Sequence, residues 1–336
     1  VTVGATTGMW AGGSGTFTPN NTTLNSLYSP SASEIAAGSV TLTLASTNNG
    51  NCNQTTDNII INFTNPPTVN AGPNTNICKN NASTILSGLV GGPTTTGIWS
   101  GVSGSFNPNN TTLSSTYTPS ASELTAGFAD IILTSTNNGN CNQVVDTVRV
   151  IFTGAPIVAT GPDISVCANN PTVAINASVT VGATTGIWSG GNGTFNASNT
   201  SLSITYIPTP AEILAGSANL VLSSTNNGNC KQEKDSVLIT FTNAPIVAAG
   251  SDLISCINNA STLLSGNVSG PTSTGYWSNG SGTFNPDSSI LGSTYTPSAA
   301  EITAGFVTLY LNSSNNGNCN QVKDTLVINF TNAPAA

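Results

Sequence analysis

Four tryptophans are spaced at one fixed interval along this chain of 336 residues, and it contains no others. Each follows a Thr-Gly-X triplet, at Trp10, Trp99, Trp188 and Trp277. The differences 99−10, 188−99 and 277−188 are all 89. A constant period of this size indicates a tandem array of similar units. We expect repeats at 1–66, 67–155, 156–244 and 245–333, with 334–336 beginning the next linker.

The composition excludes several classes of function. Charged residues make up 5% of the chain, against roughly 25% in ordinary soluble domains. Five Lys and Arg residues and a net charge of −8 cannot form the basic face that a nucleic-acid binder needs. Histidine, the commonest general base and metal ligand, is absent. No apolar run reaches the ~20 residues of a membrane span. We therefore expect no enzyme, cofactor, bound metal, nucleic acid or membrane insertion.

Strand patterns dominate each repeat. In the second repeat Ala129, Ile131 and Leu133 alternate with other residues, and a later run has Val148 and Val150 on one parity. A period of two predicts half-buried strands. The intervening Asn-Asn-Gly-Asn at 137–140 predicts a tight turn. Each repeat should therefore close with a β-hairpin.

One helical signal recurs in every repeat. Ser or Thr stands three residues before Glu, which is the pattern of a capping box, and a glycine follows one turn later. The four glutamates are Glu34, Glu123, Glu212 and Glu301. About seven short strands in about 90 residues, with one short helix, predict an all-β fold. We expect a tandem array of immunoglobulin-like antiparallel β-sandwiches.

Seven cysteines form two series with the same 89-residue spacing, and such pairs in a polar chain suggest an oxidising compartment. Pairing within each repeat predicts Cys78–Cys141, Cys167–Cys230 and Cys256–Cys319, with the partner of Cys52 outside the chain. The alternative pairs neighbours across each junction, as Cys52–Cys78, Cys141–Cys167 and Cys230–Cys256. The first is preferred because both cysteines then belong to one sandwich.

The repeat resembles the tandem Ig-like or PKD-like repeats of large secreted Bacteroidota surface proteins, associated with type IX secretion and gliding. The resemblance rests on Thr-Gly-Ile-Trp-Ser-Gly at 96–101, Tyr-Thr-Pro-Ser-Ala-Ser-Glu at 117–123 and Ser-Thr-Asn-Asn-Gly-Asn-Cys at 135–141. It covers essentially the whole chain. It implies an extracellular stalk, filament or adhesin with no catalytic residues.

Three sites resemble the O-glycosylation sequon of that group, which is Asp followed by Ser or Thr and an aliphatic residue. The candidate acceptors are Thr147, Ser236 and Thr325. Strand parity places all three on the outward side. Covalent glycans are therefore expected partners, although Asp-Thr-Val is also an ordinary beginning for a strand.

We expect a non-catalytic extracellular protein that forms a fibre, filament or stalk on a bacterial surface. Short proline junctions, such as Asn65-Pro66-Pro67, restrict the backbone and predict a semi-rigid array of roughly 100 Å or more. The alternative is an adhesin that binds glycans or surfaces. Its site should fall where repeats differ, at 180–184 or at Tyr276, Asn279 and Asp287.

The first repeat begins late in its own pattern. Val1 is in register with Val90, so counterparts of the 23 residues from Pro67 to Leu89 are not in this chain. An open sandwich edge favours strand pairing. Other copies of the chain are therefore expected partners, by strand complementation at the first repeat, unless upstream sequence completes it.

Overall fold

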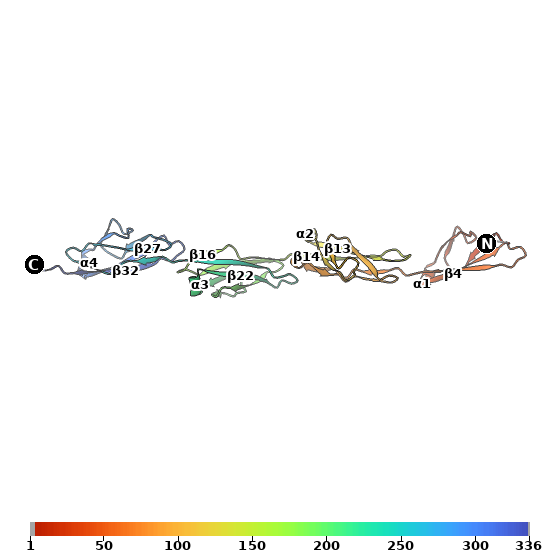
Figure 1. Ribbon diagram of the computed structural model, residues 1–336, viewed down its shortest axis with the longest axis horizontal. Helices are drawn as coiled ribbons and strands as arrows, with labels where there is room; N and C mark the ends of the chain where they lie inside the picture. Colours follow the sequence, from red (N-terminus) through yellow and green to blue (C-terminus); the bar gives the residue numbers. More distant parts are fainter. Residues whose placement is uncertain (1–3, 335–336) are drawn as a thin grey trace. The chain divides into compact units, whose positions relative to one another are not determined.

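The computed structural model describes residues 4–334. Its elements recur in the order expected from the 89-residue period (Figure 1). The first repeat contains β1 (Thr7–Ala11), β2 (Thr16–Thr18), β3 (Leu27–Ser29), α1 (Ala32–Ala37), β4 (Ser39–Thr47) and β5 (Thr56–Asn62).

The second repeat is the fullest guide to the unit, because all of its residues are described. It contains β6 (Thr68–Asn70), β7 (Thr75–Cys78), η1 (Lys79–Asn81), β8 (Thr84–Ile85), β9 (Leu89–Gly91), β10 (Thr96–Ser100), β11 (Ser105–Asn107), β12 (Thr116–Thr118), α2 (Ala121–Ala126), β13 (Phe128–Thr136) and β14 (Val145–Thr153). The nine strands exceed the seven predicted because the opening and second strands are each divided in two.

The remaining repeats follow the same order. The third contains β15 (Pro156–Ala159), β16 (Ile164–Cys167), β17 (Val173–Asn176), β18 (Ser178–Val181), β19 (Thr185–Gly190), β20 (Thr194–Asn196), β21 (Ser203–Ile207), α3 (Pro210–Ala215), β22 (Ser217–Thr225) and β23 (Lys234–Thr242). The fourth contains β24 (Ile246–Ala248), β25 (Leu253–Cys256), β26 (Thr262–Leu263), β27 (Asn267–Ser269), β28 (Gly275–Ser278), β29 (Thr283–Asn285), β30 (Thr294–Thr296), α4 (Ala299–Ala304), β31 (Phe306–Ser313) and β32 (Lys323–Thr331).

The predicted closing hairpin is confirmed. β13 and β14 pair antiparallel, with Ala129 opposite Val150 and Ile131 opposite Val148. These side chains are buried, because alternate residues of a strand point to one face of its sheet. The same pairing joins β22 to β23 and β31 to β32.

One strand of each sandwich runs in a direction that the sequence pattern does not predict. The four-stranded sheets have the orders β10-β13-β14-β7, β16-β23-β22-β19 and β25-β32-β31-β28. β16 pairs parallel with β23, and β25 pairs parallel with β32. The strand that ends at the first cysteine therefore runs alongside the last strand of its own repeat, and both finish at the same end. The prediction of purely antiparallel sandwiches is wrong in this respect.

Each tryptophan motif lies in a sandwich core. Trp99, Trp188 and Trp277 are at most 2% exposed. Each packs with a buried tyrosine and with the inward residues of the closing hairpin. The tryptophans therefore mark the interior of successive β-sandwiches, and they are not recognition residues on the surface.

Two compact units divide the chain by contact density. One comprises residues up to Ile77 together with Ala82–Thr153, and the other comprises Cys78–Asn81 together with the residues from Gly154 onward. The backbone boundary at Thr153 lies two residues before the predicted repeat boundary at Ala155. The repeat boundaries themselves stay a prediction.

Candidate functional site

Two disulfides join cysteines that belong to different repeats. Cys78 is bonded to Cys230, and Cys167 is bonded to Cys319, each with 4.9 Å between the two Cα atoms. Both bridges span 152 residues, and both lie within the second compact unit. The first cysteine of one repeat is thus bonded to the second cysteine of the following repeat.

This finding corrects the predicted pairings Cys78–Cys141, Cys167–Cys230 and Cys256–Cys319, and neither bridge belongs to the alternative scheme. The parallel strand explains the error. Cys167 lies opposite Thr242, at the end of β23, whereas Cys230 precedes Lys234 at the beginning of β23. At ~3.3 Å per residue, the two ends of this nine-residue strand lie roughly 25–30 Å apart, and a disulfide needs Cα atoms within about 7 Å.

Asparagine side chains hold the two loops together around the first bridge. The Asn80 side chain accepts a hydrogen bond from the Lys231 backbone N–H (3.1 Å) and donates to the Lys231 carbonyl (3.1 Å). It also donates to Glu233 Oε1 (2.7 Å), and Asn81 donates to the Asn229 carbonyl (3.4 Å). We call this arrangement, the disulfide with its flanking asparagine contacts, a clasp.

The second clasp repeats the first at positions 89 residues later. Asn169 accepts from the Asn320 N–H (3.0 Å) and donates to the Asn320 carbonyl (3.0 Å). Asn170 donates to the Asn318 carbonyl (3.4 Å). Sequence analysis treated the Asn-Asn pairs after each first cysteine only as turn residues. Their recurrence at 80–81, 169–170 and 258–259 was the available signal.

Three cysteines of the described chain form no disulfide: Cys52, Cys141 and Cys256. Under the 152-residue spacing, each has its partner position outside residues 1–336. That position would be 408 for Cys256 and −11 for Cys141, by adding or subtracting 152. The Cys52 partner was predicted to lie outside the chain, and the spacing places it there too.

The aspartates of the three predicted glycosylation sequons have structural partners. Asp146 and Asp324 each accept a hydrogen bond of 2.8 Å, from the backbone N–H of Ala71 and Ala249 respectively. Asp235 accepts from the Thr160 backbone N–H (2.8 Å) and from the Thr160 hydroxyl (2.9 Å). Each aspartate therefore fixes the opening segment of its own repeat onto the last strand.

The candidate glycan acceptors Thr147, Ser236 and Thr325 are exposed on β14, β23 and β32. Their hydroxyl groups lie on the outward face, as the strand parity predicts. Glycosylation itself stays a prediction.

The predicted capping boxes are confirmed at all four helices. In the third repeat Glu212 accepts hydrogen bonds from the Thr209 N–H (2.8 Å), the Asn192 N–H (2.7 Å) and the Tyr206 hydroxyl (2.7 Å). The glutamate thus joins the helix N-terminus to a loop and to a core tyrosine. These contacts give the repeated glutamates a structural role.

Burial and hydrogen bonding act in opposite directions on these carboxyl groups. Desolvation raises the pKa of Glu123, but hydrogen bonds from Ser120, Ser103 and Tyr117 outweigh it and lower that pKa to about 2. Burial raises the pKa of Tyr206 to about 12, with a further contribution from the hydrogen bond to Glu212. Such carboxylates stay ionised and the tyrosines stay neutral across the ordinary pH range.

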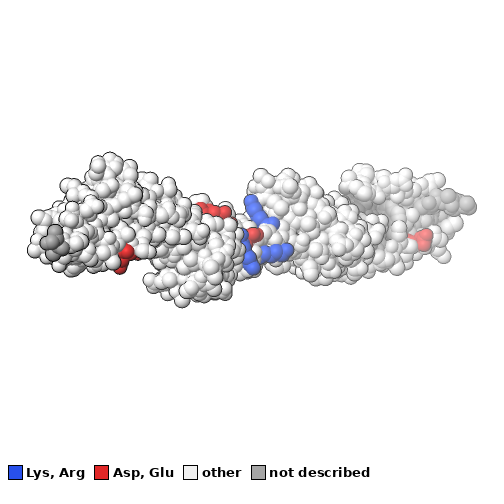
Figure 2. Space-filling model, turned by 60° about the vertical axis from the view of Figure 1, so that its left-hand side comes forward, with Lys and Arg blue, Asp and Glu red and all other residues white. Residues whose placement is uncertain are grey.

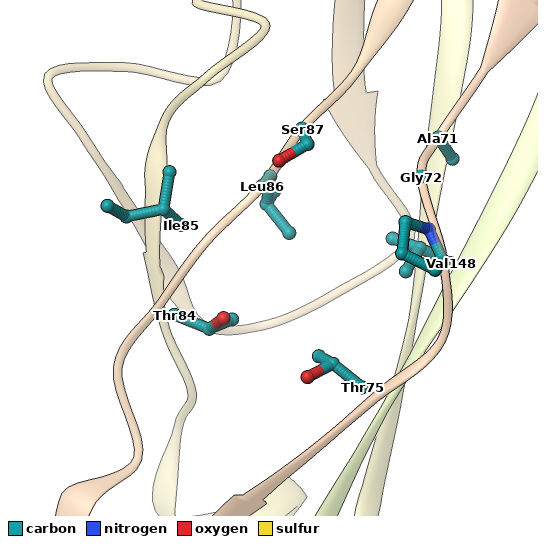
Figure 3. Close-up of a pocket in the computed structure, with 9 residues that line it drawn as sticks. Ala71, Gly72, Thr75, Thr84, Ile85, Leu86, Ser87 and Val148 are labelled. Atoms are coloured by element: carbon teal, nitrogen blue, oxygen red, sulfur yellow. The ribbon is translucent and has the colours of Figure 1, made fainter.

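The pockets on the described residues offer little space for a ligand. Figure 3 shows one in the second repeat, where Leu86 points toward Val148 and Ile85 points away from it. Its volume is about 140 Å³, whereas small-molecule sites usually have ~300–1,000 Å³. It is a packing gap between the opening segment and the sandwich.

The residues that vary between repeats do not gather into a site. Asn279 donates a hydrogen bond to the Thr308 carbonyl (2.9 Å). Asp287 accepts from the Ser289 backbone N–H (2.8 Å) and so forms a local turn. Tyr276 is partly exposed on β28. The first two of these differences are explained by local backbone contacts.

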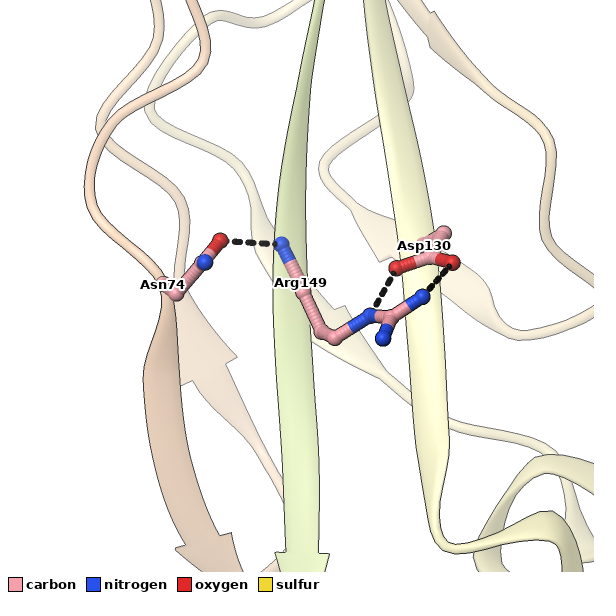
Figure 4. Close-up of polar contacts among 3 residues, drawn as sticks. All are labelled: Asn74, Asp130 and Arg149. Carbon is pink, nitrogen blue, oxygen red and sulfur yellow. Dashed lines mark hydrogen bonds and ion pairs between the residues drawn. The ribbon is translucent and has the colours of Figure 1, made fainter.

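The charged groups are few and paired locally. Figure 2 shows a face that is almost entirely uncharged, with Lys and Arg gathered in one region. Arg149 forms a two-pronged ion pair with Asp130, with both distances 2.6 Å, and its backbone N–H donates to Asn74 (Figure 4). Both side chains are more than a third exposed, so the pair contributes little to stability. Among residues 4–334 no group of three or more potential metal ligands is found.

Comparisons with solved structures find tandem arrays of small β-domains. A three-Ig segment of titin covers 79% of this chain and 99% of its own length at 10% identity, with a TM-score of 0.44. The first five immunoglobulin domains of Sidekick-1 cover 97% and 74% at 13% identity, with a TM-score of 0.32. Cadherin domains 3–6 of protocadherin gammaB7 cover 98% and 96% at 12% identity, with a TM-score of 0.35.

No protein-family model and no curated protein matches the sequence. The fold class is the predicted one, a tandem array of immunoglobulin-like β-sandwiches. Within the described part of the chain, no helix is long and apolar enough to cross a membrane.

Proposed function

We propose that this chain is an extracellular structural repeat protein that forms a fibre, filament or stalk on a bacterial surface. The observation that carries the proposal is the clasp, because it bonds each repeat covalently to the next. A second covalent connection beside the backbone restricts how far two successive domains can separate. Such a connection suits a protein whose task is to keep domains in a series.

Two further properties support an extracellular location. Disulfides form and persist in oxidising compartments and are rare in reducing ones. Asparagine and other uncharged polar side chains make the contacts around both bridges, and hydrogen bonds between neutral groups depend little on ionic strength. The clasps should therefore tolerate large changes in salt.

The uncharged surface would gain solubility from covalent glycans. We propose Thr147, Ser236 and Thr325 as the acceptors, since each is exposed and follows an aspartate at the beginning of a long strand. Mass spectrometry of protein from its native source should find glycan mass on peptides that contain these residues. Unmodified peptides at all three positions would contradict this part of the proposal.

Labelling of the native cells tests the structural role. Antibodies against the third and fourth repeats should decorate extracellular fibres or stalks in electron micrographs, with several labels spaced along one structure. Confinement of the label to the cell interior would overturn the proposal. An adhesin role predicts in addition that the purified chain binds glycans or surfaces, but no pocket or cluster of variable residues favours it.

A further inference from the structure

The open face of the first repeat marks a binding site for another polypeptide segment. We propose that it takes an extended segment with the sequence pattern of residues 67–89, and that Cys141 captures the cysteine of that segment in a disulfide. The proposal rests on a comparison between the first repeat and the three others. It goes beyond the structural role proposed above and does not depend on it.

The last strand of the first repeat is exposed where its counterparts are buried. Ile59 is 50% exposed, whereas its counterpart Val148 is 3% exposed, and the counterpart of the half-buried Ile61 is the fully buried Val150. β5 forms an edge of its sheet, in the order β1-β4-β5. In the other repeats the corresponding strand is flanked by β7, β16 or β25.

A groove lies against these exposed side chains. It has a volume of about 240 Å³ and is lined mainly by apolar side chains: Trp10, Phe17, Leu27, Tyr28, Leu42, Ile59 and Ile61. Partly unpaired edges and exposed apolar faces of this kind favour the addition of a strand.

The other repeats show which kind of segment fills this space. In the second repeat the segment places Ala71 and Leu86 in the core cluster, at 1% and 3% exposure. Its backbone is held by Asp146, which accepts from the Ala71 N–H. The counterpart of Asp146 in the first repeat is Asp57, which is exposed and accepts from its own neighbour Asn58 (2.9 Å). The acceptor that would anchor the segment is therefore present.

Cys141 already occupies the position that a clasp requires. In the first clasp both sulfurs lie near one carbonyl oxygen, that of Gly154, at 3.8 Å for Cys78 and 3.5 Å for Cys230. Asn65 is the counterpart of Gly154, since 154−89 is 65. The Cys141 sulfur lies 3.6 Å from the Asn65 carbonyl, and both residues belong to the first compact unit.

The loop around Cys141 also offers the groups that bind the asparagines of a clasp. Lys231 and Asn320 present their backbone N–H and carbonyl to Asn80 and Asn169. The counterpart of both in the second repeat is the exposed Asn142. A segment with Cys-X-Asn-Asn in register would therefore meet a complete receiving half of a clasp.

The occupant is a segment from outside residues 1–336. The three copies of the pattern within this chain are built into their own sandwiches, and the cysteines of two of them are bonded. The specificity comes from two spaced features, an apolar strand that fits the groove and a cysteine at the clasp. The segment can reside in the same polypeptide or in another, and its chemistry is the same in both cases.

Thiol–disulfide exchange with a mixed disulfide supplies the chemistry without a further oxidant. When the cysteine of the segment is bonded to glutathione, the Cys141 thiolate attacks the sulfur of the segment. A new bond then forms between the two protein sulfurs, and glutathione leaves as the thiolate. The proton lost by Cys141 is taken up by glutathione.

A synthetic peptide with the sequence of residues 67–89, carrying glutathione on Cys78, tests the proposal on the full chain. We expect it to form a disulfide with Cys141 at least tenfold faster than with Cys52 or Cys256, as measured by peptide mapping under non-reducing conditions. A peptide with Leu86→Asp should lose this preference, because a carboxylate would enter the apolar groove.

Two chain variants complete the experiment. C141S should abolish rapid capture, whereas C52S should leave its rate unchanged. Because a Ser variant can affect the fold, a second measurement uses the C78S peptide on the unaltered chain, where binding should raise the melting temperature of the first unit without any covalent bond. Equal labelling of the three thiols, or faster labelling of Cys52, would overturn the proposal, as would the absence of any effect of the C78S peptide.

Discussion

Single carboxylates organise several elements of each repeat. Glu212 accepts hydrogen bonds from a helix cap, a loop and a core tyrosine. One side chain thereby satisfies donors that come from three parts of the sandwich. The charge persists in a largely buried position because charge-assisted hydrogen bonds outweigh its desolvation.

Stability should respond to acid only at low pH. Hydrogen bonds outweigh desolvation and lower the pKa values of Glu34 and Glu123 to about 2, from an ordinary value of 4.5. A lowered pKa contributes stability that is fully present above pH 4.5 and is lost as the pH falls toward 2. Histidine, which would titrate near neutrality, is absent.

Urea denaturation at a series of pH values measures this response. We expect a constant free energy of unfolding from pH 8 to pH 5 and a decline below pH 4.5. The combined variant E34Q and E123Q should show a weaker decline. A loss of stability that begins between pH 8 and pH 5 would contradict the assignment.

The aspartate of the last strand allows a matched test. Asp235→Ala removes two hydrogen bonds to Thr160 and should lower the free energy of unfolding by ~1–3 kcal/mol. Asp57→Ala in the first repeat is the control, because Asp57 is exposed and bonds only locally among the contacts described. Chemical denaturation of both variants compares them, and similar losses would contradict the role of Asp235.

At the level of elements, local patterns predict local structure well. The alternation in 129–133 and 148–152 predicted the closing hairpin, and Ser120 with Glu123 predicted α2. In these elements the residues that interact are close in the sequence. The period of the side chains or the spacing of the cap is therefore enough to identify them.

The direction of β7 could not be predicted in the same way. A strand of four residues has the same alternation whether it runs parallel or antiparallel to its neighbour. That direction decides which end of the sandwich receives Cys78, and so which cysteine it can reach. The two candidate pairings weighed only cysteines that are neighbours in the sequence, so the 152-residue spacing escaped both.

Disulfide mapping distinguishes the pairings directly. Digestion of the oxidised protein should yield linked peptides that contain Cys78 with Cys230 and Cys167 with Cys319. A Cys78–Cys141 peptide would contradict the parallel arrangement of β7. Reduced protein serves as the control for peptides that remain together without a covalent bond.

Removal of one bridge should destabilise the second unit measurably. C230S opens a loop of 152 residues, and the loss of such a cross-link costs ~2–5 kcal/mol. Cys52 is the control position, because it is exposed and unbonded, and C52S should change the unfolding free energy by less than ~0.5 kcal/mol. An equal effect of both variants would argue against a stabilising bridge.

At the scale of the whole molecule, the two bridges overlap. One spans 78–230 and the other spans 167–319. Every peptide bond between residues 78 and 319 is therefore enclosed by at least one disulfide loop. Backbone cleavage anywhere in this range leaves the two pieces covalently joined.

An engineered protease site tests this overlap. Inserted at Gly191 in the third repeat, it should give one band on a non-reducing gel after cleavage and two bands after reduction. The same insertion at the counterpart Gly13 in the first repeat, outside both loops, should give two bands under either condition. Separation of the pieces from the Gly191 variant without reductant would contradict the overlapping bridges.

The clasps also determine how the chain responds when its ends are pulled. Each bridge withholds the 152 residues of its loop from extension, a contour of roughly 500 Å at ~3.3 Å per residue. A repeat enclosed by a bridge can lose its fold under tension, but its backbone cannot be drawn out until a sulfur–sulfur bond breaks. The redox state of the surroundings therefore sets the maximum length of the molecule.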